Sequence, residues 1–434
     1  MKILFVYPKF RKYLETNPEI LKAIDFPLYA GFKSSPSLGI PILAAITPKE
    51  HEIFFADGNL DTIPYDTHFD LVAINCFTPQ ARYAYEVGDK FRERGVLTVM
   101  GGIHPSNMPE DCKKHTDSVV IGEAETLWSL VLEDAKSGKL KPFYKTDKVF
   151  DLADYPLPNR EIYKHKKGYD WKPLLIQCFR GCGFTCAFCA IPCAHGSKLR
   201  MRPVKSVINE IENNLDLEGL FIADDQLLLP DPEIEKYAFE FFASLKSVGY
   251  KNKIFLNCSA LMNQNEKLLK LVKDSGVDSV YLVMGFDPVS VKAISFNKPK
   301  EAEKNIKMLR EAGIDIFASV GIGLDVDGKD IFDRHLDFLS RNEIKHVEFW
   351  ILTPFPGTPS WNSFNEKGRI LTTDFDLYNG AHTVFQPKKM TKEELDRGFI
   401  YLWKEFFSRF PLQPLDAAKY YNMTNEYLEK YNLK

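Results

Sequence analysis

Short apolar runs alternate with longer amphipathic stretches along most of this chain, and this alternation limits the possible folds more than any other sequence feature. Near the start, such runs occur at residues 3–7, 52–56, 71–76, 97–100 and 118–121. The stretch at 79–94 has Tyr83, Val87 and Phe91 four positions apart, as in an amphipathic helix. Uninterrupted apolar strands separated by helices predict a parallel sheet covered on both faces. The expected N-terminal domain, residues 1–137, is therefore a doubly wound, Rossmann-like sheet of five strands in an α/β protein.

A second series of strands and helices begins near residue 174, after a different kind of segment. Residues 138–173 are rich in Lys, Asp and Pro and show no sustained period, which predicts a linker. Apolar runs then recur at 174–177, 220–223, 254–258, 279–284, 315–321 and 346–352, and helical patterns fill 203–214, 231–248, 264–276, 299–312 and 329–342. Six such units predict a (β/α)6 partial TIM-type barrel over residues 174–365, with its chemistry at the C-terminal strand ends. Residues 366–434 have helical patterning around 392–409 and are expected to form a small, mainly helical C-terminal region.

Charge and hydropathy remove several classes of function. The 56 Lys and Arg nearly balance the 59 Asp and Glu, for a net charge of −3, so the chain lacks the basic character of a nucleic-acid-binding protein. No apolar stretch reaches the ~18 to 20 residues that a membrane span needs, and the N-terminal run is too short for a signal peptide. We therefore expect a cytoplasmic protein without a membrane span. In that reducing compartment, its 8 Cys residues are expected to be thiols or metal ligands rather than disulfides.

Five of the 8 Cys residues lie between positions 178 and 193, directly after the first strand of the expected barrel. Among them, Cys182, Cys186 and Cys189 form a Cys-x3-Cys-x2-Cys pattern, and thiolates are the usual ligands of iron–sulfur clusters. A four-iron cubane held by three thiolates leaves one iron open, much as a catalytic zinc keeps one position free. Two alternatives remain: a closed electron-transfer cluster with Cys178 or Cys193 as fourth ligand, and a structural zinc site using Cys193 or His195.

The cysteine pattern, with Phe188 directly before the last Cys, resembles the signature of radical SAM enzymes, and the six-unit barrel matches their usual fold. The resemblance implies a [4Fe-4S] cluster on Cys182, Cys186 and Cys189, with an open iron that binds S-adenosylmethionine (SAM). Electron transfer then cleaves SAM to a 5′-deoxyadenosyl radical, which abstracts a hydrogen atom from the substrate. The resemblance also implies a set of SAM-binding positions: Phe188, Arg200, Arg202, Asp224, Asp225, Asn257, Gly285, Asp287, Gly321 and Gly323.

Several of these positions also have a structural interpretation. Asp224 and Asp225 suit the ammonium group of SAM, or they cap the next helix. Asn257 binds the ligand or satisfies backbone groups, and Arg200 and Arg202 pair with the SAM carboxylate or face solvent. The glycines after the fifth barrel strand would let the backbone approach adenine or ribose. The fourth strand lacks the Gly-x-Glu-Ser pattern that is common in relatives, which leaves the ribose contact open.

The strand ends of the N-terminal domain also carry small and polar residues, at the edge where an open parallel sheet binds ligands. Thr78 follows the third strand, Gly101 and Gly102 follow the fourth, and Glu123 follows the fifth. This order resembles cobalamin-binding domains and implies that these four residues bind cobalamin; in a degenerate domain they would only form tight turns. The Asp-x-His-x-x-Gly motif, whose His ligates cobalt, is absent, and His104 does not replace it.

The two resemblances span roughly residues 1–405 and imply a cobalamin-dependent radical SAM methyltransferase that methylates an unactivated carbon. One SAM supplies the methyl group through the corrinoid, a second supplies the radical, and an external donor such as flavodoxin or ferredoxin supplies the electron. A first alternative is cyclisation or rearrangement without methyl transfer, and a second is a closed iron–sulfur electron carrier or sensor. The expected substrate is a small molecule, and lipids, tetrapyrroles, natural-product intermediates and peptides stay open as its class.

Overall fold

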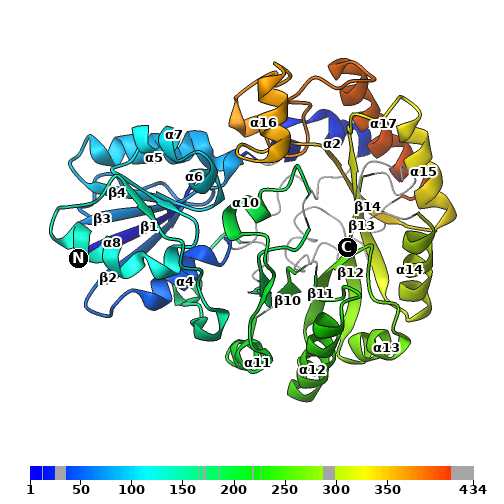
Figure 1. The fold of residues 1–434 in the computed structure, drawn as a ribbon, viewed down its shortest axis with the longest axis horizontal. Coiled ribbons are helices and arrows are strands. Elements are labelled where there is room, and N and C mark those ends of the chain that lie inside the picture. Colours follow the sequence, from blue (N-terminus) through cyan, green and yellow to red (C-terminus); the bar gives the residue numbers. More distant parts are fainter. Residues whose placement is uncertain are drawn as a thin grey trace.

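The computed structural model describes residues 1–11, 13–24, 36–164, 166–169, 173–184, 186–217, 219–224, 226–286 and 299–411. Two parallel sheets, each flanked by helices, lie side by side in it (Figure 1). The α/β architecture with an N-terminal parallel sheet and a second parallel sheet is thus confirmed. None of the described helices is long and apolar enough to cross a lipid bilayer.

The N-terminal sheet contains six parallel strands in the order β2-β1-β3-β4-β5-β6. Its strands are β1 (Lys2–Tyr7), β2 (Glu52–Asp57), β3 (Leu71–Asn75), β4 (Leu97–Gly101), β5 (Ser118–Ile121) and β6 (Phe143–Lys145). The strand order reverses between β1 and β3, and open α/β sheets bind ligands at such a switch point. Along β1, Ile3 and Phe5 pack into one core while Leu4 and Val6 pack into the other. Burial on both faces explains why this strand is apolar without interruption.

Helices cover both faces of this sheet. They are α4 (Gly39–Ile46), α5 (Ala81–Arg92), α6 (Ile103–Asn107), α7 (Pro109–Lys114) and α8 (Trp128–Lys136), with short 3-10 helices η1 (Thr78–Gln80) and η2 (Ala124–Thr126). Two earlier helices, α1 (Tyr13–Thr16) and α2 (Glu19–Ile24), lie by the C-terminal region instead, where α2 packs against α17 (Lys392–Arg409). On one face, the ring of Trp128 packs against Phe5 with centroids 5.7 Å apart. On the other, Val87 and Phe91 of the predicted amphipathic stripe are buried. The helical period therefore marked the face of α5 that meets the sheet.

The sheet has one strand more than the five predicted, and this strand comes from the segment interpreted as a linker. The additional strand, β6, pairs in parallel with β5, with Tyr144 opposite Val120. Three residues in a Lys-rich context carry too little apolar pattern to be recognised as a strand. The rest of the segment contains η3 (Leu152–Asp154) and α9 (Glu161–Lys164), and its buried Tyr155 and Tyr163 attach it to the protein.

The second sheet has six parallel strands whose spatial order follows the chain, as in the predicted partial barrel. Its strands are β7 (Leu174–Ile176), β10 (Gly219–Ile222), β11 (Lys253–Ser259), β12 (Val277–Phe286), β13 (Asp315–Ile322) and β14 (His346–Ile351). Its helices are α11 (Val204–Glu212), α12 (Pro232–Val248), α13 (Glu266–Asp274), α14 (Pro299–Glu311) and α15 (Ile331–Arg341). The side chains of Asp231 and Asn265 accept backbone N–H bonds and so begin α12 and α13.

Between β7 and α11 the chain leaves the barrel and returns. It forms β8 (Phe179–Arg180), α10 (Ile191–His195) and β9 (Arg200–Met201), and β8 and β9 pair antiparallel. The helix α10 lies between the two sheets (Figure 1). The cysteine-rich segment is thus a protrusion of the barrel toward the N-terminal domain.

The C-terminal region contains α16 (Pro359–Glu366), η4 (Phe375–Leu377) and α17 (Lys392–Arg409). Helix α17 begins at the predicted residue, after a capping box formed by Thr391 and Glu394. It packs on the barrel, with the ring of Trp403 5.5 Å from that of Phe349. Arg82 of the N-terminal domain pairs with Asp376 at 2.5 Å, so this region contacts both domains rather than forming a separate cap.

Candidate active site between the two domains

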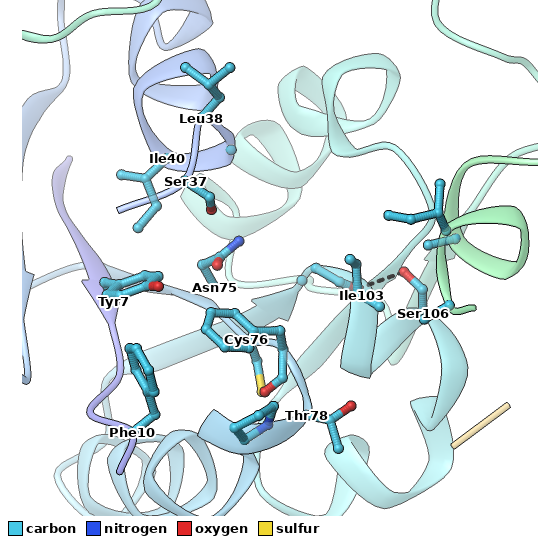
Figure 2. Close-up of a pocket in the computed structure, with 18 of the residues that line it drawn as sticks. Tyr7, Phe10, Ser37, Leu38, Ile40, Asn75, Cys76, Thr78, Ile103 and Ser106 are labelled. Atoms are coloured by element: carbon cyan, nitrogen blue, oxygen red, sulfur yellow. Dashed lines mark hydrogen bonds between the residues drawn. The ribbon is translucent and has the colours of Figure 1, made fainter. Parts of the chain in front are cut away.

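A cavity of about 1290 Å³ lies between the strand ends of the N-terminal sheet and the inner face of the barrel strands. Its N-terminal wall includes Tyr7, Asn75 and Thr78 (Figure 2), and its opposite wall consists of side chains from the barrel strands. Ordinary small-molecule pockets measure roughly 300 to 1,000 Å³. The cavity therefore has room for more than one small molecule.

The Cys-x3-Cys-x2-Cys loop lies at the barrel side of this cavity, which Cys189 itself lines. Cys182 is almost fully buried, and the Gln226 side-chain amide donates a hydrogen bond to its Sγ at 3.3 Å. Burial and the neighbouring Cys189 and Cys182 raise the pKa of Cys186 to about 12. The three sulfur atoms are thus close enough to repel one another as thiolates. Binding to iron relieves this repulsion, so the loop fits a bound cluster.

The three thiols are the ligand type and number that an open [4Fe-4S] cluster needs. Among the described residues, no three His, Cys, Asp or Glu side chains converge on one metal position. In a cubane the thiolates bind different iron atoms and therefore stand apart from one another. A [4Fe-4S] cluster would be held by Cys182, Cys186 and Cys189.

The residues considered as a fourth ligand have other partners. Cys178 is fully buried below the loop, where burial and Asp224 hold the pKa of its thiol well above the usual value. Cys193 is exposed, and its thiol donates to the carbonyl oxygen of Gly357 at 3.7 Å. The Nδ1 atom of His195 lies 3.4 Å from a carboxylate oxygen of Glu123. These contacts favour three cluster ligands over four.

Four charged residues connect the cysteine loop to the N-terminal domain, and we call them the interdomain clamp. Arg180 donates to Glu125 at 2.7 Å, and Arg200 donates to Glu123 at 2.5 Å. Burial alone would raise the pKa of Glu123, but hydrogen bonds from His195 and Arg200 and the charges of Arg180 and Arg200 together lower it well below its usual value. The clamp therefore holds the cluster loop against the strand end that follows β5.

Two of the residues predicted to bind a cofactor have partners within the protein, and their binding to the cofactor stays a prediction. Glu123, expected to bind cobalamin, still lines the cavity, but both of its carboxylate oxygens accept hydrogen bonds from Arg200. Arg200, expected to pair with the SAM carboxylate, is held in the same ion pair. The sequence did not show this pairing because 77 positions separate the two residues.

Two other residues predicted to bind SAM make hydrogen bonds within the barrel, and their binding to SAM stays a prediction. The carboxylate of Asp224 accepts hydrogen bonds from two backbone N–H groups directly after β7, at 2.5 and 3.2 Å. It therefore positions the start of the cysteine loop. Arg202 is buried, and each nitrogen of its guanidinium donates to an oxygen of Ser206 or Glu210. Asp225 and Asp287 lie outside the described residues.

Two of the glycines predicted to approach SAM are packed against side chains of the protein. A Cβ at Gly321 would lie 2.8 Å from the ring of Trp350, and one at Gly323 would lie 3.1 Å from Leu395 of α17. Packing inside the protein is thus one reason for glycine at both positions, and the expected backbone contact with adenine or ribose stays a prediction. Gly285 has a φ of +66° at an irregularity in the pairing of β12 with β13, a conformation that favours glycine.

Phe188 and Asn257 are the predicted SAM residues that line the cavity. The ring of Phe188 lies 6.2 Å from that of Trp350. The side-chain amide of Asn257 donates to the carbonyl oxygen of Ala223 at 3.3 Å, whereas its buried Oδ1 accepts no hydrogen bond from the described residues. A buried amide oxygen without a donor is costly, so Asn257 is suited to accept a hydrogen bond from a ligand.

On the N-terminal side, Thr78 begins a chain of hydrogen bonds that leads away from the cavity. Its Oγ1 lies 3.3 Å from Nδ1 of His104. The other ring nitrogen of His104, Nε2, lies 2.8 Å from the hydroxyl of Tyr85. That hydroxyl donates a hydrogen bond to Asp111 at 2.9 Å. Burial lowers the pKa of His104 to about 4, so its ring is neutral at pH 7. Since Tyr85 donates to Asp111, it accepts from Nε2–H, and Nδ1 accepts from Thr78. Thr78 therefore presents an acceptor oxygen to the cavity.

Gly101 and Gly102 line the same wall. Gly102 has a φ of +114°, and a Cβ there would lie 2.6 Å from the carbonyl oxygen of Cys76. Only glycine allows the end of β4 to turn this close to the end of β3. Together with Gly122 after β5, these small residues keep the space in front of the sheet open, as a bulky cofactor requires.

The barrel wall of the cavity consists of aromatic residues that no sequence motif marks. Phe221, Phe255, Tyr281 and Phe317 come from four consecutive strands, with neighbouring ring centroids 5.6, 6.3 and 5.5 Å apart. Beside them, Glu348 of β14 accepts a hydrogen bond from the hydroxyl of Tyr281 at 2.9 Å. In each strand, successive side chains point to opposite faces of the sheet. Both faces of these strands are mostly apolar, so the sequence does not tell which face points into the barrel.

The fold and the site define a class of two-domain enzyme, in which a three-cysteine cluster loop faces a Rossmann-like domain across one cavity. A family model described as the radical SAM superfamily matches residues 176–339, and a model described as the B12 binding domain matches residues 34–131. The chain thus contains a radical SAM domain and, N-terminal to it, a B12-binding domain. Its cofactors are a [4Fe-4S] cluster, SAM and cobalamin, and it needs an external reductant.

Two relatives from Chlorobaculum tepidum are similar along most of their length. The chain is 29% identical to bacteriochlorophyllide d C-8(2)-methyltransferase, over 87% of this chain and 88% of the relative. It is also 29% identical to bacteriochlorophyllide d C-12(1)-methyltransferase, over 92% and 87%. The solved structure of the radical SAM methyltransferase TsrM from Kitasatospora setae, with cobalamin and a [4Fe-4S] cluster bound, matches with a TM-score of 0.63 at 15% identity, covering 84% of this chain and 78% of that one. At this identity the likeness establishes the fold alone.

Proposed function

We propose that this enzyme is a cobalamin-dependent methyltransferase that acts on an unactivated carbon of a large, mostly apolar substrate of the tetrapyrrole class. The observation that carries the proposal is the shared cavity, which brings the cluster loop and the strand ends of the B12-binding domain around one space. The aromatic barrel wall favours a flat, apolar substrate. The names of the two Chlorobaculum relatives, both bacteriochlorophyllide methyltransferases, support the tetrapyrrole class.

Each wall of the cavity has a distinct task in this proposal. Cys182, Cys186 and Cys189 hold the cluster, which supplies the electron that cleaves SAM. Phe188 and Asn257 contact SAM, and Asn257 accepts a hydrogen bond from one of its donor groups. On the opposite wall, Thr78, Gly101 and Gly102 hold cobalamin. The untested predictions stay part of the proposal. They are contact of Glu123 with cobalamin and contact with SAM of Arg200, Arg202, Asp224, Asp225, Gly285, Asp287, Gly321 and Gly323.

The remaining residues position these groups and keep water out. The interdomain clamp fixes the cluster loop relative to the B12-binding domain, so that one substrate reaches both cofactors. The aromatic wall excludes water, which protects a reactive radical from side reactions. Flavodoxin or ferredoxin is the proposed electron donor.

Product analysis tests the proposed reaction. Protein reconstituted anaerobically with iron, sulfide and hydroxocobalamin, and supplied with SAM, reductant and bacteriochlorophyllide d, is expected to form equimolar S-adenosylhomocysteine, 5′-deoxyadenosine and methylated product. The first compound reports the SAM that supplies the methyl group, and the second reports the SAM that supplies the radical. Formation of 5′-deoxyadenosine without S-adenosylhomocysteine would instead indicate a radical reaction without methyl transfer. Absence of both from protein that retains its iron would favour an electron carrier.

Corrinoid binding tests the role of Thr78. Thr78→Val keeps the shape of the side chain but removes the acceptor oxygen, so the Kd for hydroxocobalamin should rise about fivefold, as for the loss of a hydrogen bond worth about 1 kcal/mol. Tyr85→Phe should raise it less, because the chain of bonds behind Thr78 is broken while the oxygen remains. Titration of the corrinoid absorbance measures both. The matched control is Thr67→Val, at an exposed threonine of the same domain; unchanged affinity in Thr78→Val would contradict the assignment.

A further inference from the structure

The barrel wall of the cavity combines a row of aromatic rings with one carboxyl group. Phe255, Tyr281 and Phe317 lie next to one another on β11, β12 and β13, and Glu348 follows on β14. The register places Glu348 opposite Ser319, whose hydroxyl accepts a hydrogen bond from the indole N–H of Trp350 at 3.0 Å. Glu348 therefore lies within an aromatic surface that faces the ligand space.

No ion pair explains the presence of Glu348 there. In the part of the chain that the structure describes, no Lys, Arg or His lies within ion-pair distance of it, and its partner is the hydroxyl of Tyr281, which donates to Oε2. Two other carboxylates of the cavity, Glu123 and Glu125, are each paired with an arginine. Glu348 is partly buried and lines the cavity. A carboxyl group without a cation is costly on an aromatic wall, and an apolar residue would fill a purely structural position at lower cost.

The surroundings also indicate which form of the carboxyl group faces the cavity. Burial raises the pKa of Glu348, and the hydrogen bond from Tyr281 only partly opposes this effect. Glu348 therefore keeps its proton to a higher pH than an exposed glutamate does. With Oε2 engaged by Tyr281, a Glu348 that holds its proton donates a hydrogen bond from Oε1 to a ligand in the cavity that it lines. Its natural partner is an acceptor oxygen.

We propose that Glu348 and Tyr281 form a substrate subsite that hydrogen-bonds a carbonyl or carboxyl oxygen and thereby selects which carbon faces the cluster. This inference rests on the proposed function, because it needs the substrate to lie in the shared cavity. Glu348 contacts the substrate, and Tyr281 is a positioning residue that holds the carboxyl group in place. The subsite thus supplies specificity on an otherwise apolar wall, where shape alone discriminates weakly.

Three aromatic probes of matched size test the subsite without knowledge of the substrate. These are 1-acetylnaphthalene, with an acceptor oxygen; 1-ethylnaphthalene, a hydrocarbon; and 1-(aminomethyl)naphthalene, a cation at pH 7. Their Kd values are measured by equilibrium dialysis on protein loaded with cluster, SAM and hydroxocobalamin. The preference is the Kd of the hydrocarbon divided by the Kd of the ketone. We expect this ratio to be about fivefold larger for the wild type than for Glu348→Leu, as for the loss of one hydrogen bond. Glu348→Gln, whose amide N–H still donates, should keep most of the preference.

The design separates the subsite from a merely structural role and from the proposed function. Tyr281→Phe keeps the ring but frees the carboxyl group, so it should reduce the preference in part, and Glu366→Leu is the control at an exposed glutamate. Equal preference in the wild type and Glu348→Leu would overturn the inference, as would tightest binding of the amine. Because corrinoid absorbance and 5′-deoxyadenosine formation are measured on the same samples, loss of cofactor binding is distinguishable from loss of the subsite.

Discussion

Replacing Cys186 with Ala is expected to abolish SAM cleavage and to strip the protein of most of its iron. Two thiolates cannot hold a cubane that needs three, and without the cluster no electron reaches SAM. The rate of 5′-deoxyadenosine formation should fall by about 10⁶-fold or more, which is the lower end of the acceleration that enzymes supply. Iron and sulfide analysis of the reconstituted variant and quantitation of 5′-deoxyadenosine measure the two effects.

The matched control is Cys193→Ala. In the wild type, the thiol of Cys193 donates to the carbonyl oxygen of Gly357, and Cys193 is not part of the three-cysteine pattern. The variant should therefore retain the iron content and the SAM cleavage of the wild type. If Cys193→Ala lost its iron as completely as Cys186→Ala does, the cluster would have four protein ligands. The closed electron-transfer alternative would then be correct.

The second large effect is expected from Glu123→Gln in the interdomain clamp. This change leaves the partly buried guanidinium of Arg200 without its carboxylate, and breaking an ion pair of this kind costs up to about 3 to 5 kcal/mol, the cost for a fully buried pair. The free energy of unfolding should fall by up to that amount in urea denaturation of the anaerobic protein. The surface pair Arg341–Glu303 provides the control, because Glu303→Gln removes a half-exposed partner and should cost less than about 1 kcal/mol.

The clamp also predicts the sign of a pH dependence. The pKa of Glu123 in the folded protein lies below the value of about 4.3 for an unfolded glutamate. Its contribution to stability is therefore fully present above that value and is lost as the pH falls toward the lower, folded-state pKa. The wild type should lose more stability than Glu123→Gln does between pH 5 and acid pH. Parallel stability curves for the two proteins would contradict the assignment of Glu123 to the clamp.

Much of the fold could be predicted because its strands are buried on both faces and its helices have one apolar stripe. The six barrel strands and the start of α17 followed directly from these patterns. The strand β6 could not be predicted, since it has three residues and its stability comes from pairing with β5. The residue pattern of a short segment does not predict a strand whose stability comes from its neighbour in the sheet.

The site was predictable where chemistry depends on spacing along the chain and unpredictable where it depends on approach in space. Cys182, Cys186 and Cys189 belong to one loop, so their spacing alone indicated a cluster. Arg202 and Asp224 lie at strand ends, where ligands can bind. Arg202 donates to Glu210 and Asp224 accepts from the backbone N–H of Cys178, and the sequence does not show that these groups are neighbours. Glu348 carried no motif and became visible only when the barrel interior was known.

In the function proposed above, one iron of the cluster lacks a protein ligand and faces the B12-binding domain. Electron paramagnetic resonance of the reduced, hydroxocobalamin-loaded protein, recorded with unlabelled SAM and with SAM carrying ¹⁷O in its carboxylate, tests it most directly. We predict that SAM shifts the cluster spectrum and that the label broadens it, because SAM coordinates the open iron. A spectrum that saturating SAM leaves unchanged would contradict the account.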